Sequence, residues 1–285
     1  MEQSDRQAPV QHSRLVIRER NGHNSRVITR RRFLTNSGAL VASSLLPASA
    51  ADESAIRKIS IFHTTDLHGH VLPTTNYDGV GNLGGIARCA TQIQQWRKQS
   101  PHHLLLDIGD IYQGTLEGYL SRGRMMTTIF NKLRYDGWVL GNHEFDWGPE
   151  VVADAIANSR MPVLTANIEV EGKAAGQIDS GPFSDVAPWM IREVGGMKLG
   201  VVGLITPGLP YWLRPELLGG ISPTDPTETL KRSVAAMRAE GVDAIIAAGH
   251  MGARFKDDFA NPIHSMLTSV DGIDVYLAGH THRDS

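Results

Sequence analysis

The chain has 285 residues, of which 41% are hydrophobic and 20% are charged, and its formal net charge is −2. This length and composition allow a full core, as one large domain or one and a half smaller ones. Residues 1–50 contain eight arginines and three acidic residues, whereas residues 51–285 contain 20 basic and 27 acidic residues. The acidic body argues against binding of a nucleic-acid polymer, but a phosphate ester could still be attracted by bound cations.

The amino-terminal segment resembles a twin-arginine export signal. The run Arg30-Arg31-Arg32 is followed by a weakly apolar stretch up to Leu46 and then by Ala48-Ser49-Ala50. We therefore predict a signal peptide over residues 1–50, cleavage after Ala50, export by the twin-arginine translocase, and a periplasmic or secreted product. The apolar stretch is shorter than the roughly 20 residues of a membrane span, so we expect no permanent membrane anchor. A basic tail followed by a helix is the alternative.

Residues 51–285 are predicted to form one catalytic domain that begins with alternating strands and helices. Strands are expected over Lys58–Thr65, around Leu104 and over Tyr135–Leu140, with a helix after Gly85 and another near Ser121–Leu133. This alternation predicts a parallel sheet with right-handed crossovers. Cys89, the only cysteine, lies on the apolar stripe of the first helix and is expected to be a core side chain.

The second half of the domain is predicted to supply a second sheet. A strand is expected over 163–168, and the runs 189–194 and 197–202 read as a hairpin across Gly195-Gly196. Asp225 is the expected cap of a helix, after which come a strand over 242–248, a helix near 261–268 and a last strand over 275–278.

Side chains that bind metals follow five of the predicted strands. Because the carboxyl ends of parallel strands meet at one edge of a sheet, we expect these side chains to converge on one site. The candidate ligands are Asp66, His68, Asp110, Asn142, His250, His280 and His282. His63, inside the first strand, and His70, just after the Asp66 motif, are expected to be structural or to support the ligands.

Seven candidate ligands are too many for one ion. They would serve two ions if one carboxylate were shared, and Asp110 in the middle strand is the natural bridge. The mixed nitrogen and oxygen set suits manganese, zinc, iron or cobalt. His143 is needed by neither ion and could donate to a phosphoryl or leaving oxygen while Asp146 holds its other nitrogen.

Together these motifs resemble the signature of the calcineurin-like metallophosphoesterases, in the form typical of the 5′-nucleotidase family. The discriminating part is Asn142-His143-Glu144-Phe145-Asp146. The resemblance implies an α/β fold, a four-layer α/β/β/α sandwich with mixed sheets, and His143 and Asp146 as the catalytic dyad. It also implies two ligand sets: Asp66, His68, Asp110 and His282 on one ion, and Asp110, Asn142, His250 and His280 on the other.

The resemblance further implies hydrolysis of phosphate monoesters, nucleotides first, by metal-hydroxide attack, with Asn142 and His143 contacting the substrate. Members of this family continue past the last histidine motif into a carboxyl-terminal substrate domain, and we expect that domain to be absent here, since Ser285 is three residues beyond His282. Two alternatives remain open. One is a 2′,3′-cyclic-nucleotide phosphodiesterase with 3′-nucleotidase activity, and the other is a metal-binding inactive fragment or accessory subunit. A thiosulfohydrolase of the same family is disfavoured by the presence of His143.

Overall fold

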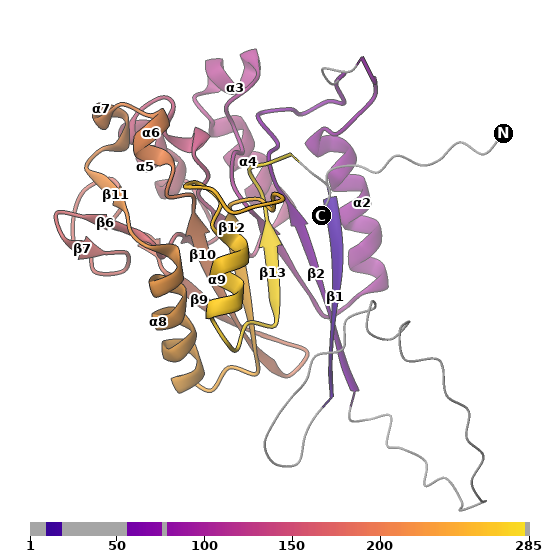
Figure 1. Cartoon of the computed structure of the whole chain (residues 1–285). Coiled ribbons are helices and arrows are strands. Elements are labelled where there is room, and N and C mark those ends of the chain that lie inside the picture. The colour runs from indigo at the N-terminus through magenta and orange to yellow at the C-terminus, as the bar shows by residue number, and fades with distance from the viewer. Residues whose placement is uncertain (1–9, 19–55, 76–78, 283–285) are drawn as a thin grey trace, which may run out of the picture.

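The computed structural model describes residues 10–18, 56–75 and 79–282 (Figure 1). The three arginines, the apolar stretch after them and the cleavage site predicted after Ala50 lie outside the described residues. None of the helices in the described part has the length and hydropathy that a membrane span needs.

The first sheet has six strands and carries the amino-terminal half of the domain. Its spatial order is β1 (Val10–Arg18), β2 (Ile56–Thr64), β3 (His103–Asp107), β4 (Gly137–Val139), β5 (Val163–Leu164) and β8 (Val186–Ala187). All neighbours from β2 to β8 are parallel, as the strand and helix alternation predicts. Strand β1, which precedes the arginine run 30–32 in the sequence, pairs antiparallel with β2 at the edge.

The second sheet has four strands, in the order β13 (Val275–Ala278), β12 (Ala244–His250), β10 (Met197–Ile205) and β9 (Trp189–Val194). The predicted hairpin is confirmed, since β9 and β10 pair antiparallel across Gly195 and Gly196, which both have positive φ. Strands β10, β12 and β13 are parallel. A small antiparallel sheet is formed by β11 (Ile221–Pro223), β6 (Ile168–Val170) and β7 (Lys173–Ala174).

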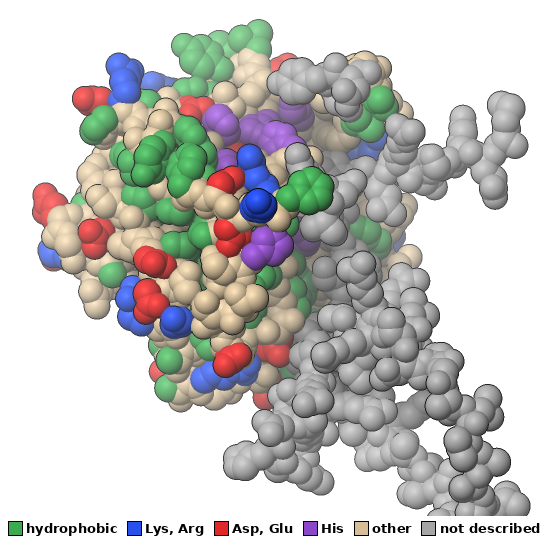
Figure 2. Space-filling model, in the orientation of Figure 1, with side chains coloured by type: hydrophobic (Ala, Val, Ile, Leu, Met, Phe, Trp, Pro, Cys, Tyr) green, Lys and Arg blue, Asp and Glu red, His purple; other side chains and the backbone are tan. Residues whose placement is uncertain are grey.

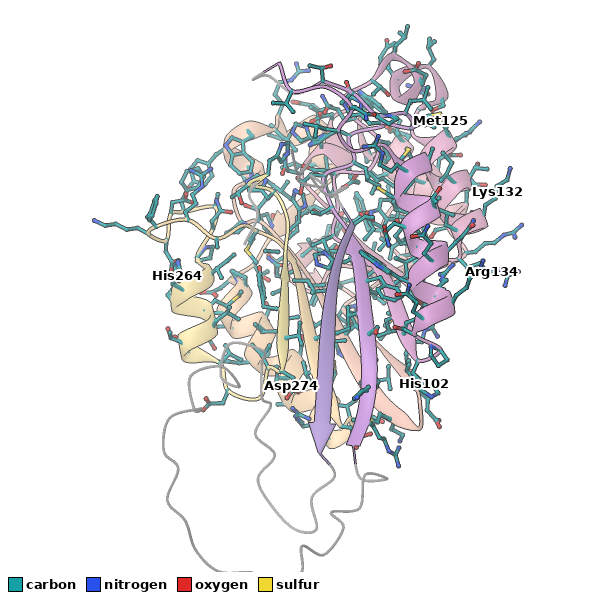
Figure 3. The ribbon with its side chains drawn as sticks, turned by 90° about the vertical axis from the view of Figure 1, so that its right-hand side faces the viewer. His102, Met125, Lys132, Arg134, His264 and Asp274 are labelled. Carbon is teal, nitrogen blue, oxygen red and sulfur yellow. The ribbon has the colours of Figure 1, made fainter. Side chains whose placement is uncertain are left out.

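Helices cover the outer faces of the two large sheets, which confirms the four-layer α/β/β/α sandwich. The helices α2 (Ile86–Gln99), α4 (Arg124–Leu133) and α5 (Pro149–Ala157) pack on the first sheet, and α8 (Pro226–Ala239) and α9 (Ile263–Ser269) pack on the second. Shorter helices are α3 (Leu116–Ser121), η2 (His143–Phe145), α6 (Leu209–Trp212) and α7 (Pro215–Leu218). Figure 3 shows the strands between α2 on one side and α9 on the other.

Three apolar clusters fill the spaces between these four layers. In β2, Ile59 and Ile61 belong to the cluster between the two sheets, whereas Phe62 belongs to the cluster under α2 and α4. This alternation is the two-residue period of a strand buried on both faces. Cys89 is buried in the cluster under α2, in agreement with the prediction for it.

Two predicted elements differ in the structure. The helix expected near 121–133 forms as α4 and begins three residues later, because Arg122 and Gly123, with φ values of 48° and 79°, end α3 before α4 begins. The strand expected over 163–168 becomes β5 and β6, in different sheets. The buried Asn167 side chain bonds to the N–H and the C=O of Ile205 in β10, so the chain leaves the first sheet at this point.

The parallel strands of both large sheets end at the same edge of the sandwich. In Figure 3, His102, just before β3, and Asp274, just before β13, both lie at the lower edge. The carboxyl ends of these strands therefore lie together at the upper edge, which is where the candidate ligands follow them.

Candidate metal centre

The predicted ligands come from both sheets and meet at this shared edge. Asp66 follows β2, Asp110 follows β3 and Asn142 follows β4, whereas His250 ends β12 and His280 follows β13. The structure forms two clusters, in each of which the potential ligand atoms lie within 4.8 Å of one another. The first is Asp66, His68 and His282, and the second is Asp110, His250 and His280. Figure 2 shows histidine side chains gathered in one place on this face of the molecule.

In the first cluster, two imidazole nitrogens face each other. His68 Nδ1 lies 2.9 Å from the carbonyl oxygen of Gln113, to which it can only donate, so the neutral ring has its lone pair on Nε2. That Nε2 lies 3.1 Å from Nε2 of His282, which is itself 3.2 Å from Asp66 Oδ1. Donor atoms about 2.1 Å from one ion and at right angles to each other are separated by about 3 Å, so this spacing suits a shared cation.

Asp110 lies between the two clusters. Its Oδ2 is 3.0 Å from Nε2 of His250 in the second cluster and 3.9 Å from Nε2 of His68 in the first. Its Oδ1 accepts a hydrogen bond from the backbone N–H of His143 at 2.9 Å. The carboxylate is therefore placed to contact ions in both clusters.

Two buried atoms in or beside the second cluster make no hydrogen bond, although buried polar atoms normally do. Among the described residues, the four such side-chain atoms include Asn142 Oδ1 and His250 Nε2. His250 Nδ1–H donates to the carbonyl oxygen of Ile108 at 2.6 Å, so the lone pair of the neutral ring is on Nε2 and faces the Asp110 carboxylate, another acceptor, at 3.0 Å. A buried lone pair without a donor is unfavourable, and a cation beside Asp110 would satisfy both atoms. The residues present therefore fit a metal ion.

Backbone strain is concentrated in the candidate ligands. Of the nine non-glycine residues with positive φ in the described part of the chain, five are Asp66, His68, Asp110, His280 and His282. This conformation costs free energy for aspartate and histidine. It is therefore kept only where the surrounding structure imposes it. The surrounding loops therefore impose this backbone conformation on the candidate ligands.

His143 lies beside the clusters and is oriented by Asp146. Its Nδ1 is 2.7 Å from Asp146 Oδ2, and its ring contacts that of His68 with the centroids 5.3 Å apart. The hydrogen bond to Asp146 raises the pKa of His143 above its usual value, and burial opposes this effect. The side chain is 37% exposed, so it can meet a molecule bound at the ligands.

Two buried carboxylates support this edge, and neither was predicted from the sequence to have a role. Glu144 accepts hydrogen bonds from the backbone N–H groups of Asp110, Ile111 and Gly141, and Tyr112 donates to its carbonyl oxygen. Asp107 accepts from the Thr64 hydroxyl at 2.5 Å and from the N–H of Gly109 at 2.8 Å. Burial raises the pKa of both carboxyl groups. Glu144 could have been found as the acidic residue inside the Asn142 motif, whereas the place of Asp107 in a strand gives no such signal.

His63 and His70 belong to neither cluster. His63 is buried and its Nδ1 has no hydrogen-bond partner. His70 bonds through its backbone, accepting from the N–H of Ile86 and donating to Leu67.

Comparison with known proteins gives consistent matches. The sequence profile of the calcineurin-like phosphoesterases matches residues 59–284. A 5'-nucleotidase of Rattus norvegicus is 36% identical over 250 residues, which cover 85% of this chain and 41% of the relative. A snake venom 5'-nucleotidase of Crotalus adamanteus is 36% identical over 230 residues, which cover 79% of this chain and 37% of the relative. The chain thus spans about two fifths of the length of these relatives.

A solved structure extends the comparison to three dimensions. The crystal structure of a 5'-nucleotidase precursor from Thermus thermophilus superposes with a TM-score of 0.64 at 30% sequence identity, and the match covers 78% of this chain and 41% of that one.

Proposed function

This chain belongs to the calcineurin-like phosphoesterase family. We therefore propose that it hydrolyses phosphate monoesters at a centre of two divalent metal ions, with nucleotides as the favoured substrates. The observation that carries the proposal is the position of Asp110 between two clusters of ligand atoms, together with the unpaired lone pairs of Asn142 and His250. The names of the nucleotidase relatives support the substrate class.

We assign the two ions to separate ligand sets that share one carboxylate. Asp66, His68, Asp110 and His282 would hold one ion, and Asp110, Asn142, His250 and His280 the other. The mixture of carboxylate, amide and imidazole ligands favours manganese, zinc, iron or cobalt. When bound, two such ions would lower the pKa of a water nucleophile and offset the negative charge of the phosphoryl group.

His143 is the proposed catalytic donor. With Nδ1–H held by Asp146, a protonated ring would present Nε2–H to a phosphoryl or leaving-group oxygen. The raised pKa keeps the ring protonated to higher pH, and the donor would stabilise charge that develops in the transition state. Asn142 would also contact the phosphoryl group, since it lies next to His143 in the same loop.

A substrate comparison tests this function. The purified chain, loaded with manganese, should release phosphate from a chromogenic phosphate monoester and from AMP. Preference for 2′,3′-cyclic AMP and 3′-AMP would favour the cyclic phosphodiesterase instead. No release from any of these esters by folded, metal-loaded protein would favour an inactive metal-binding subunit.

We also propose that residues 1–50 are an export signal and that residues 51–285 are the catalytic domain. The order of arginines, apolar stretch and small residues supports the signal, and the snake venom source of one relative is compatible with export. Cleavage after Ala50 would remove β1 together with the signal. Amino-terminal sequencing of the exported protein tests this division, because it should begin at Ala51.

A further inference from the structure

A polar groove lies between α4 and α5, the helices on either side of β4 in the chain. Its volume is about 590 Å³, which is within the range of small-molecule sites. The residues that line it from α4 are spaced three and four positions apart and so share one face of that helix. They are Arg124, Thr127, Thr128, Asn131 and Lys132. None of them is a candidate metal ligand, and we call this site the α4–α5 groove.

Small side chains keep the α4–α5 groove open, and hydrogen bonds fix its walls. Ala155 and Ala157 line it from α5. The Asn131 side chain of α4 donates to the carbonyl oxygen of Asn158 and accepts from the backbone N–H of Arg160, both at 2.8 Å. These bonds join α4 to the segment in which α5 ends, so a ligand would meet walls that are already arranged.

The charge of the α4–α5 groove is positive. Three of the described residues that line it are cations, and none of them is acidic. Arg124 forms an ion pair with Asp154, at 2.7 and 2.9 Å. Within the described part of the chain, the ammonium of Lys132 and the guanidinium of Arg160 have no hydrogen bond or ion pair. Since the backbone of Arg160 bonds to the residue before Lys132, two unpaired cations belong to one end of the groove.

The end of α4 beside these two cations does not present free carbonyl groups to an anion. The carboxyl end of a helix normally has a partial negative charge. Arg97 offsets it here by donating to the carbonyl oxygens of Leu133 and Arg134, at 2.6 and 2.8 Å. Figure 3 shows Lys132 and Arg134 projecting from this layer, away from the strands. Residues 51–285 contain 27 acidic and 20 basic residues, so this concentration of positive charge is a local exception.

We propose that the α4–α5 groove binds a small hydroxylated organic phosphate. Its phosphoryl group would lie at Lys132 and Arg160, because a guanidinium group binds phosphate with two parallel hydrogen bonds and two cations balance the charge of a phosphate monoester. Thr128 and Asn158, which line the groove and are exposed, would exchange hydrogen bonds with the hydroxyl groups of the ligand. This inference does not depend on the proposed function.

A probe that cannot be hydrolysed tests the α4–α5 groove. The phosphonate 3,4-dihydroxybutyl-1-phosphonate has the anion and two hydroxyl groups but no ester bond. In an NMR titration of the zinc-loaded full chain, the amide signals of Thr128 and Asn158 should shift and saturate. Signals from the loops of the candidate metal centre report separately on any second molecule bound there, so the two sites are distinguished in one experiment.

Charge removal identifies the anion site. The double variant Lys132→Gln, Arg160→Gln should weaken the binding reported by Thr128 and Asn158 more than about tenfold, since each charge-assisted hydrogen bond contributes about 1.5–3 kcal/mol. Both side chains are exposed, so the fold should be kept, and the NMR spectrum itself shows whether it is. The matched control is Lys98→Gln, Lys198→Gln, which removes two exposed positive charges from α2 and β10 and should leave this binding unchanged.

Three further probes define the chemistry of the ligand. Inorganic phosphate has the anion without the hydroxyl groups and should bind more weakly than the phosphonate. The carboxylate 4,5-dihydroxypentanoate should also bind more weakly, because it has a single negative charge, and 1,2,4-butanetriol should give no shift. Binding of the carboxylate or the triol as tight as that of the phosphonate would overturn the assignment to a phosphate.

Two results would overturn the site itself. One is the absence of a saturable shift at Thr128 and Asn158 in the parental chain. The other is equal affinity for the phosphonate in the parental chain and in Lys132→Gln, Arg160→Gln. No hydrolysis enters these measurements, so a chain that cleaves no ester would contradict the proposed function and leave the result for the α4–α5 groove intact.

Discussion

Glu144 Oε2 accepts a hydrogen bond from the backbone N–H of Asp110 at 2.8 Å and so joins the loop after β4 to the loop that carries the central candidate ligand. The same oxygen accepts from Gly141, and Oε1 accepts from Ile111. Glu144 is fully buried, so three backbone donors that water cannot reach depend on one carboxylate. We infer that Glu144 positions the metal centre without touching the substrate.

Replacing Glu144 by glutamine should therefore lower both stability and metal affinity. The amide presents N–H groups where the carboxylate accepted hydrogen bonds, and leaving a buried backbone donor unpaired costs about 1–3 kcal/mol. Denaturant unfolding and manganese titration measure the two effects. Glu171→Gln is the control, because Glu171 is exposed, and it should change neither. A Glu144→Gln chain with parental stability and affinity would remove the positioning role.

Replacing His143 by asparagine should separate catalysis from metal binding. If His143 donates to the phosphoryl group, the variant keeps both ions and most substrate affinity while kcat falls by roughly 10² to 10⁴. Asp146→Asn should give a smaller loss, because it removes the partner that orients the ring at 2.7 Å. His250→Asn is the contrasting change and should weaken metal binding itself. Loss of an ion from His143→Asn, or an undiminished kcat, would show that the assigned role is wrong.

Buried His63 should make the fold less stable in mild acid. Desolvation by burial lowers the pKa of His63 to about 4, below the value of about 6.5 expected in the unfolded chain. Between these values the unfolded chain binds more protons, so stability falls as the pH falls through this window. From pH 7 to pH 5 the loss should be about 2 kcal/mol. The loss of unfolding free energy between pH 7 and pH 5 should be smaller by that amount in His63→Leu. Denaturant unfolding of both chains at the two pH values measures it. Equal losses in the two chains would contradict the assignment.

Export should depend on the arginine run. Replacing Arg30, Arg31 and Arg32 with lysine keeps the charge but removes the guanidinium pair that the twin-arginine translocase recognises. We expect unprocessed precursor in the cytoplasm, detected by fractionation and immunoblotting. Normal processing and export of the lysine variant would mean that another route is used.

The sequence predicted what depends on local pattern. Runs of buried residues located the strands, and the position of Asp66, Asp110 and His250 directly after them placed the candidate ligands at one edge. The Gly195-Gly196 hairpin and the family resemblance predicted that the strands divide between two sheets. The hairpin and the motifs that carry the resemblance are both short stretches of the chain.

What the sequence could not predict depends on contacts between distant residues. The strand expected over 163–168 is divided because Asn167 bonds to Ile205, 38 positions away. The β-propensity of a short segment does not depend on such a distant contact and could not predict it. The partnerless atoms of Asn142 and His250 are apparent only once their surroundings are known. The ring contact of Tyr211 with Phe259 likewise joins α6 to a distant segment of the chain.

The central claim is that Asp110 serves two ions at once, and metal stoichiometry tests it most directly. The parental chain, reconstituted with excess manganese and freed of unbound metal, should carry two ions per chain by elemental analysis. Asp110→Asn should weaken both, whereas His282→Asn should weaken one, since the Asp110 carboxylate lies beside ligands of both clusters. A parental chain that is folded but holds one ion or none, or an Asp110→Asn chain that keeps one ion at parental affinity, would contradict the shared centre.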